Sequence, residues 1–76
     1  MGLQKRSLVL AGHATSVALE PAFWAVLEAM ARSEGATLAT LMARIDLHRE
    51  GRPLASASRL AALAFAGRLQ QSANQP

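Results

Sequence analysis

The stretch that decides the fold is His13-Ala14-Thr15-Ser16-Val17-Ala18-Leu19-Glu20-Pro21. From Thr15 to Leu19 the side chains alternate in character, which is typical of a half-buried strand. Pro21 suits the first position of a helix, where its missing N–H costs nothing. The pattern therefore predicts a short strand that runs directly into a helix. Because a lone strand cannot satisfy its own backbone groups, this strand needs a partner.

Two partners for the strand are consistent with the sequence. Residues 8–11 form a second candidate strand, and Gly12 followed by His13 is a signal for a type II′ hairpin. Such a hairpin would set Leu10 opposite Thr15. The apolar residues that it would bring to one face are Leu8, Leu10, Val17 and Leu19. Alternatively, Gly12 is a kink and the strand pairs with its own copy in a second chain, which the chain's size and composition favour.

The size and composition of the chain limit its sources of stability. With 76 residues it is one small domain, near the size at which a single core is barely sufficient. It contains no cysteine, so disulfides and thiolate zinc sites are excluded, which is compatible with a reducing compartment. Half of the residues are hydrophobic, mostly Ala and Leu. We therefore expect burial against another chain, and hence a homo-oligomer.

Two helices are predicted after the strand. The first covers residues 21–34, because apolar residues recur along one face at helical spacing and Gly35 is expected just past its end. Thr37 suits the cap of a second helix over residues 38–48. The residues predicted to form the apolar faces of these helices are Phe23, Trp24, Leu27, Met30, Ala31, Leu38, Leu41, Met42 and Ile45.

A third helix is predicted after the polar break at residues 48–53, starting at Ala55 or at Ser56, the better cap. It is apolar nearly all round, which is typical of a helix covered on more than one side and again indicates a partner chain. The residues expected to be available for burial are Leu60, Leu63, Ala64 and Leu69, with Ala57, Ala61 and Phe65 on an adjoining stripe. Residues 1–4 are expected to form a loose arm and residues 70–76 a frayed tail.

The sequence lacks the patterns of catalytic and cofactor sites. His13 and His48 lie in different predicted elements, and neither has a carboxylate or a third ligand at a spacing suited to zinc or a proton relay. There is no glycine-rich phosphate loop and no nucleophile elbow. We therefore expect no enzyme activity, no cofactor and no metal ion.

The charge of the chain favours a polyanion as partner. The net charge is +3, and the first nineteen residues contain Lys5 and Arg6 but no acid. A symmetric dimer would carry twice this charge, which is a modest attraction for DNA. No run approaches the roughly 20 apolar residues of a membrane span, and Gly12 interrupts the apolar run that follows Arg6. We expect a cytoplasmic protein that does not enter a membrane.

The predicted strand offers a surface that fits DNA. The major groove admits a two-stranded ribbon, and pairing of the strand with its copy would give such a ribbon two-fold symmetry. If Val17 and Leu19 point into the core, the residues that point outwards are Ala14, Ser16 and Ala18. Lys5 and Arg6 could hold phosphates beside it. The N–H groups around Thr37 and Leu38 are a second phosphate clamp, unless Thr37 simply caps its helix.

The order of strand, helix, turn and capped helix resembles a ribbon-helix-helix domain, the fold of the Arc and MetJ repressors. The motifs Lys5-Arg6-Ser7, Ala11-Gly12-His13, Thr15-Ser16-Val17, Leu19-Glu20-Pro21 and Phe23-Trp24 resemble a family of short bacterial proteins of this fold, over roughly residues 5–68. The resemblance implies one domain over residues 1–76 that is mostly α-helical with a short N-terminal β-strand. It implies an intertwined homodimer with a two-stranded antiparallel ribbon and an additional C-terminal helix.

The resemblance also implies a sequence-specific DNA-binding protein, a small transcriptional regulator that inserts a dimeric ribbon into the major groove of double-stranded DNA. The residues that we expect to bind DNA are Lys5, Arg6, His13, Ala14, Ser16, Ala18, Thr37 and Leu38. Family members often have Arg at position 14, where it can contact guanine, so Ala14 leaves Ser16 as the one polar side chain on the inferred face. Either His13, Lys5 or Arg6 takes part, or DNA affinity is weak, or the ribbon has another use.

The alternative is a protein-interaction or oligomerisation module on the same scaffold, with weak or no DNA binding. In this reading the apolar third helix, around Leu60, Leu63 and Phe65, docks a protein partner or forms a higher oligomer.

Overall fold

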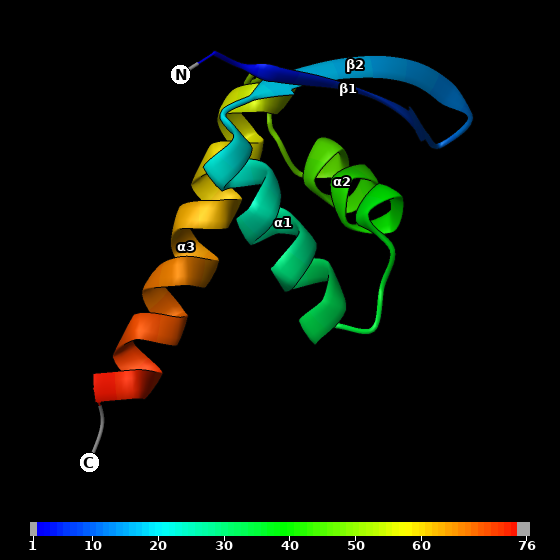
Figure 1. Cartoon of the computed structure of the whole chain (residues 1–76). Helices are drawn as coiled ribbons and strands as arrows, with labels where there is room; N and C mark the ends of the chain where they lie inside the picture. Colours follow the sequence, from blue (N-terminus) through cyan, green and yellow to red (C-terminus); the bar gives the residue numbers. More distant parts are fainter. Residues whose placement is uncertain (1, 75–76) are drawn as a thin grey trace.

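The computed structural model describes residues 2–74, with side chains described as far as residue 70. The elements are, in order, β1 (Gln4–Leu10), β2 (His13–Leu19), α1 (Pro21–Ser33), α2 (Leu38–Leu47) and α3 (Leu54–Asn74). The two strands form a hairpin, and the three helices lie on one side of it (Figure 1). The predicted architecture, mostly helical with a short β segment at the N-terminus and an additional C-terminal helix, is confirmed.

Strand β2 finds its partner within its own chain. β1 and β2 pair antiparallel, with Leu10 opposite His13. The hairpin predicted as one alternative therefore forms, but its register differs by two residues from the predicted one. The cause is the turn, whose central residues are Ala11 and Gly12 with φ angles of 51° and 83°. Two positive φ angles define a type I′ turn rather than type II′, and a shift of two residues keeps every side chain on its predicted face.

The inner face of the hairpin closes one side of the core. Leu10, Val17 and Leu19 are all at most 4% exposed. Below them lies Trp24, which is 1% exposed and donates its Nε1–H to the backbone carbonyl of Gln4 at 2.8 Å. Trp24, a residue of the predicted apolar face of the first helix, thus packs under the hairpin. Because β1 begins at Gln4, this hydrogen bond ties that strand to α1, and the expected loose arm is shorter than residues 1–4.

The first two helices agree closely with the sequence. Each ends one residue earlier than predicted, and Gly35 follows α1 with a φ of 67°. Thr37 caps α2 as predicted, because its Oγ1 accepts a hydrogen bond from the N–H of Thr40 at 3.1 Å. The fully buried members of the two predicted apolar faces are Trp24, Leu27, Met30, Ala31, Leu41 and Met42, while Phe23, Leu38 and Ile45 are partly buried.

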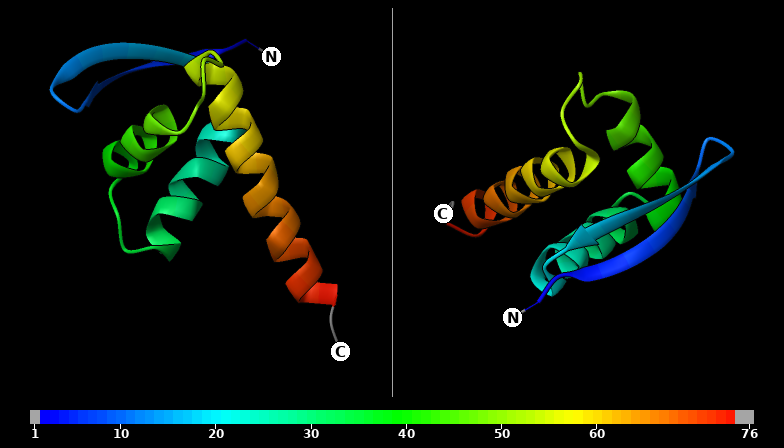
Figure 2. Two further views of the ribbon diagram at one scale, coloured as in Figure 1. Left: turned by 180° about the vertical axis from the view of Figure 1, so that it is seen from behind. Right: turned by 90° about the horizontal axis from the view of Figure 1, so that it is seen from above.

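Helix α3 differs from the prediction in its bounds. It begins at Leu54, directly after Pro53, so Ser56 lies within the helix and does not cap it. The helix continues to Asn74, through most of the predicted tail, and residues 75 and 76 lie outside the described part of the chain. In Figure 1 and in the left view of Figure 2, the C-terminal part of α3 extends past the end of α1.

The buried face of α3 consists of small side chains, of which only Ala57 was among the residues expected to be available for burial. Ala57, Ser58 and Ala62 are buried, whereas three of the leucines expected to be available for burial are exposed in this chain: Leu60 by 48%, Leu63 by 59% and Leu69 by 55%. The small side chains let α3 lie close to the other helices. At 100° per residue, Leu60 and Leu63 then fall on the opposite side of the helix. The apolar surface that these leucines form is therefore open in the described part of the chain.

Candidate nucleic-acid interface

The outer face of the hairpin consists of six side chains in three cross-strand pairs. The pairs are Lys5 with Ala18, Ser7 with Ser16, and Val9 with Ala14. Ala14 and Ser16 are exposed and Ala18 is partly exposed, so these residues lie on the face that the alternation predicts. None of the described helices covers this face (Figure 1).

The sequence prediction included Lys5 of β1 but missed two other residues of β1 on this face. Ser7 and Val9 are exposed and lie beside the predicted residues of β2. They could have been found from the alternation of residues 5–10, in which Leu8 and Leu10 mark the inner face. Because the partner of the strand was undecided, nothing in the sequence placed that alternation next to Ser16.

Lys5 and Arg6 point to opposite faces of the sheet. Lys5 is exposed on the outer face, which carries no carboxylate. Arg6 lies on the inner face, where its guanidinium pairs with Glu28 and lies 4.8 Å from the centre of the Trp24 ring. The hydrogen bond from Arg6, together with its charge, lowers the pKa of the Glu28 carboxyl. The structure thus separates the predicted phosphate-binding pair and leaves Lys5 alone on the outer face.

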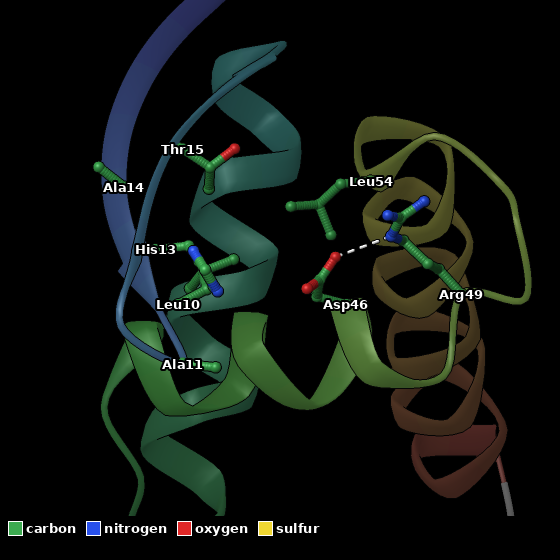
Figure 3. Close-up of a pocket in the computed structure, with 8 residues that line it drawn as sticks. All are labelled: Leu10, Ala11, His13, Ala14, Thr15, Asp46, Arg49 and Leu54. Carbon is green, nitrogen blue, oxygen red and sulfur yellow. Dashed lines mark hydrogen bonds and ion pairs between the residues drawn. The ribbon is translucent and has the colours of Figure 1, made fainter.

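His13 borders a hollow of about 400 Å³ between the hairpin turn, the end of α2 and the start of α3 (Figure 3). Asp46 and Arg49 lie on its other side and form an ion pair of 2.7 Å. His13 stands opposite Leu10 on the inner side of the sheet, away from Ser16 and Ala18. Among the described residues, no group of three or more His, Cys, Asp or Glu side chains could hold a metal ion.

Thr37 and Leu38 form the N-terminus of α2. The Thr37 hydroxyl accepts from the N–H of Thr40 and donates to its Oγ1 at 2.9 Å, and the Thr37 carbonyl accepts from the N–H of Leu41. The N–H groups of Leu38 and Ala39 lie in the first helical turn, where N–H groups have no hydrogen-bond acceptor within the helix. They carry the positive end of the helix dipole and suit a phosphate. Because α2 lies under the hairpin, one chain does not bring them onto the outer face.

Most charged side chains are neutralised in pairs. Four of the cations are paired, as Arg6–Glu28, Arg44–Glu34, Arg49–Asp46 and Arg59–Glu20. Among the side chains that the structure describes, the unpaired charges are Lys5, Arg32, Arg52, Arg68 and the acid Glu50, which account for the net charge of +3. Of these, only Lys5 lies on the outer face of the hairpin.

The antiparallel strands followed by α1 and α2 are consistent with a ribbon-helix-helix fold, to which α3 adds a further C-terminal helix. The family model described as "Ribbon-helix-helix domain" matches residues 3–66. This chain therefore belongs to the ribbon-helix-helix family. Proteins of this family generally bind DNA as transcription regulators, typically form dimers, and are typically without enzyme activity.

Among solved structures, the chain is similar to an uncharacterized protein from Bordetella pertussis Tohama I. The TM-score is 0.75 and the sequence identity is 35%, over 97% of this chain and 62% of that chain. This chain thus spans less than two thirds of the length of that relative. No curated protein matches. None of the described helices is both long enough and apolar enough to cross a membrane.

Proposed function

We propose that this chain is a bacterial, cytoplasmic transcription regulator that binds the major groove of double-stranded DNA as a homodimer. The observation that carries the proposal is the outer face of the hairpin, which is exposed, carries no acid and presents Ser16 at the middle of β2. A two-stranded ribbon fits the major groove, and side chains on one face of it reach the base edges. Membership of the family supports the same use of this face.

The dimer forms along the free edge of β2. In a two-residue hairpin, the residues that flank the turn exchange hydrogen bonds, and such pairs alternate along the strands. With Leu10 opposite His13, the residues whose N–H and C=O groups point away from β1 are Ala14, Ser16 and Ala18. An open edge of this kind is a template for another strand. A second copy that pairs antiparallel with β2, with Ser16 at the two-fold axis, provides hydrogen-bond partners for these N–H and C=O groups. The resulting two-stranded ribbon has two-fold symmetry and suits a palindromic DNA site.

Titration of labelled DNA tests the proposal. The probes are a duplex of mixed sequence, about 25 base pairs long, and a duplex enriched from a random pool by binding to the protein. If the dimer neutralises on the order of five phosphates, log K falls against log salt with a slope of about −4 to −5. Preference for the enriched duplex supports regulation at a specific site. No binding to either duplex at low salt contradicts the proposal.

Two variants test whether DNA binds to the outer face of the hairpin or to another part of the surface. Ser16→Glu places a carboxylate where the base edges would lie and is expected to abolish binding. Ala66→Glu makes the same change of charge at an exposed position of α3, in the part of that helix that runs away from the hairpin. It is expected to bind DNA like the parent. Equal affinity of Ser16→Glu and the parent means that the reading face is assigned wrongly.

A second candidate function is self-association through α3, favoured by the exposure of Leu60, Leu63 and Leu69. Leu63→Asp is the suitable probe, because Phe65 is partly buried against the core and its replacement would disturb the fold. In sedimentation velocity, a species larger than a dimer that Leu63→Asp reduces to a dimer supports this function. A parent that sediments only as a dimer, at all concentrations, contradicts it.

A further inference from the structure

Strand β1 places a second row of side chains beside the proposed reading residues of β2. Ser7 stands directly opposite Ser16, and Lys5 lies two residues away on the same face. Both Ser7 and Lys5 are exposed. On the outward side of β2 itself, Ser16 is the one polar side chain between Ala14 and Ala18. Strand β1 adds the hydroxyl of Ser7 and the ammonium group of Lys5 to the same face.

The inner face holds β1 in place. Leu10 is buried, the Gln4 carbonyl accepts the Trp24 Nε1–H, and Arg6 pairs with Glu28. These contacts involve only the inner face and the end of β1, so pairing of a second chain along the free edge of β2 leaves them intact. The dimeric sheet then has the order β1-β2-β2′-β1′, in which the prime marks the second copy.

The width of this sheet determines what each strand can reach. Neighbouring strands lie about 4.8 Å apart, so the two β1 strands lie about 14 Å apart. The major groove is about 12 Å wide. The two β2 strands therefore fit within the groove, while the β1 strands lie at its walls, where the phosphates are.

The register fixes which side chains meet the walls. Ser16 is the middle residue of β2, so a two-fold axis at this position places the two copies of Ser16 side by side. Because Ser7 is paired with Ser16 within each chain, the two copies of Ser7 and the two copies of Ser16 form one row across the sheet. Ser7 is the outer member of that row, and Lys5 follows about 7 Å along the same strand. Hydroxyl and ammonium groups are common ligands of DNA phosphates.

We infer that Ser7 and Lys5 of β1 bind the phosphates on both walls of the groove, whereas Ser16 of β2 faces the base edges. This inference rests on the proposed function and names the part of the DNA that β1 contacts. Phosphate contacts position a protein without reading sequence. Removal of the Ser7 hydroxyl therefore weakens binding to every duplex by the same factor, while changes at Ser16 alter the preference among duplexes.

The experiment measures the fluorescence anisotropy of the mixed-sequence and the enriched duplex with the parent, Ser7→Ala and Lys5→Gln, at about 50 and about 200 mM salt. Ser7→Ala is expected to lower the affinity for both duplexes by the same factor, about 5-fold or more, because a dimer loses two hydrogen bonds. Lys5→Gln is expected to make the salt slope shallower by about 2 per dimer. Ala66→Glu serves as the control for a surface change away from the hairpin.

Three results overturn the inference in distinguishable ways. If Ser7→Ala weakens binding only to the enriched duplex, Ser7 reads bases. If Ser7→Ala and also Ser7→Glu bind both duplexes like the parent, β1 does not touch DNA, and the proposed function stands without it. If the parent binds neither duplex at low salt, the proposed function fails and the inference fails with it. Circular dichroism melting of each variant verifies that the hairpin is folded, which is expected because Ser7 is exposed.

Discussion

At the scale of single residues, Arg6 and Trp24 connect the hairpin to α1. The Arg6 guanidinium lies over the Trp24 ring and pairs with Glu28, and the Trp24 Nε1–H bonds to the Gln4 carbonyl. A basic residue next to Lys5 looked like a phosphate ligand in the sequence. The alternation of the strand points the Arg6 side chain towards α1 instead, where its positive charge interacts with Glu28 and with the Trp24 ring.

Removing the hydrogen bond of Trp24 is expected to destabilise the fold slightly, and removing its ring to destabilise it strongly. Trp24→Phe keeps most of the buried ring but lacks the donor to Gln4, with an expected cost of about 1 kcal/mol. Trp24→Ala leaves a cavity, with an expected cost of about 3–5 kcal/mol. Denaturant unfolding followed by circular dichroism measures both. Equal costs for the two variants would show that the ring contributes no packing.

The stability of the fold is expected to fall in acid because of Glu28 and Glu20. The hydrogen bond and charge of Arg6 lower the pKa of Glu28, and the backbone N–H of Glu20 together with Arg59 lowers the pKa of Glu20. A carboxyl whose pKa is lower in the folded chain contributes stability above its unfolded pKa of 4.5 and loses it as the pH falls through the folded value.

The denaturation midpoint should therefore be constant near neutral pH and decrease below about pH 4.5. Glu28→Gln is the matched variant, since it keeps the shape of the side chain but cannot titrate. Its midpoint should depend less on pH than that of the parent. An identical pH dependence in the two proteins would mean that the Arg6–Glu28 pair contributes no stability.

At the scale of the elements, local signals predicted α1 and α2 well and the hairpin and α3 less well. Gly35 marks the end of α1 and Thr37 the start of α2 through interactions within a few residues, and both have the expected role. The register of the hairpin depends on Ala11 adopting a positive φ, which nothing in its side chain predicts. In α3, apolar residues surround the helix, so the pattern does not define which of them face the core.

The turn offers a substitution that is expected to stabilise the hairpin. Ala11 has a φ of 51°, a left-handed conformation that costs an L-residue free energy, whereas Asn-Gly is the preferred pair for a type I′ turn. Ala11→Asn should stabilise the fold by about 0.5–1 kcal/mol. Gly12→Ala should destabilise it, because φ at this position is 83°. Both effects are measured as shifts in the thermal midpoint; a lower midpoint for Ala11→Asn would contradict the turn type.

At the scale of the whole molecule, only part of the candidate interface followed from the sequence. The outward residues of β2 followed from the alternation around Val17. Lys5 was expected to bind DNA because of its charge. Its place on the outer face, and the contribution of Ser7, required the register of β1, and the separation of Arg6 from this face required its contacts with α1. The side of α3 that stays open could be identified only from the packing of Ala57, Ser58 and Ala62.

Assembly of the dimer can be tested with proline at the two edges of the sheet. The N–H of Ser16 points away from β1, so Ser16→Pro spares the hairpin hydrogen bonds but removes donors from the proposed dimer ladder. It should raise the dissociation constant of the dimer about 10-fold or more. Ser7→Pro makes the same change at the free edge of β1 and should leave the dimer unaffected. Analytical ultracentrifugation measures both, and the opposite ranking would mean that the chains pair through β1.

The sole tryptophan of the chain lies where β1 meets α1. It is 1% exposed, its ring lies under a guanidinium, and its N–H is bonded to the first residue of β1. Its fluorescence therefore has a single source, and the emission maximum shifts to the red if β1 detaches and water reaches the indole. The unmodified protein thus carries an optical probe of its own hairpin, which reports whether that strand remains in place when a second chain or a duplex is added.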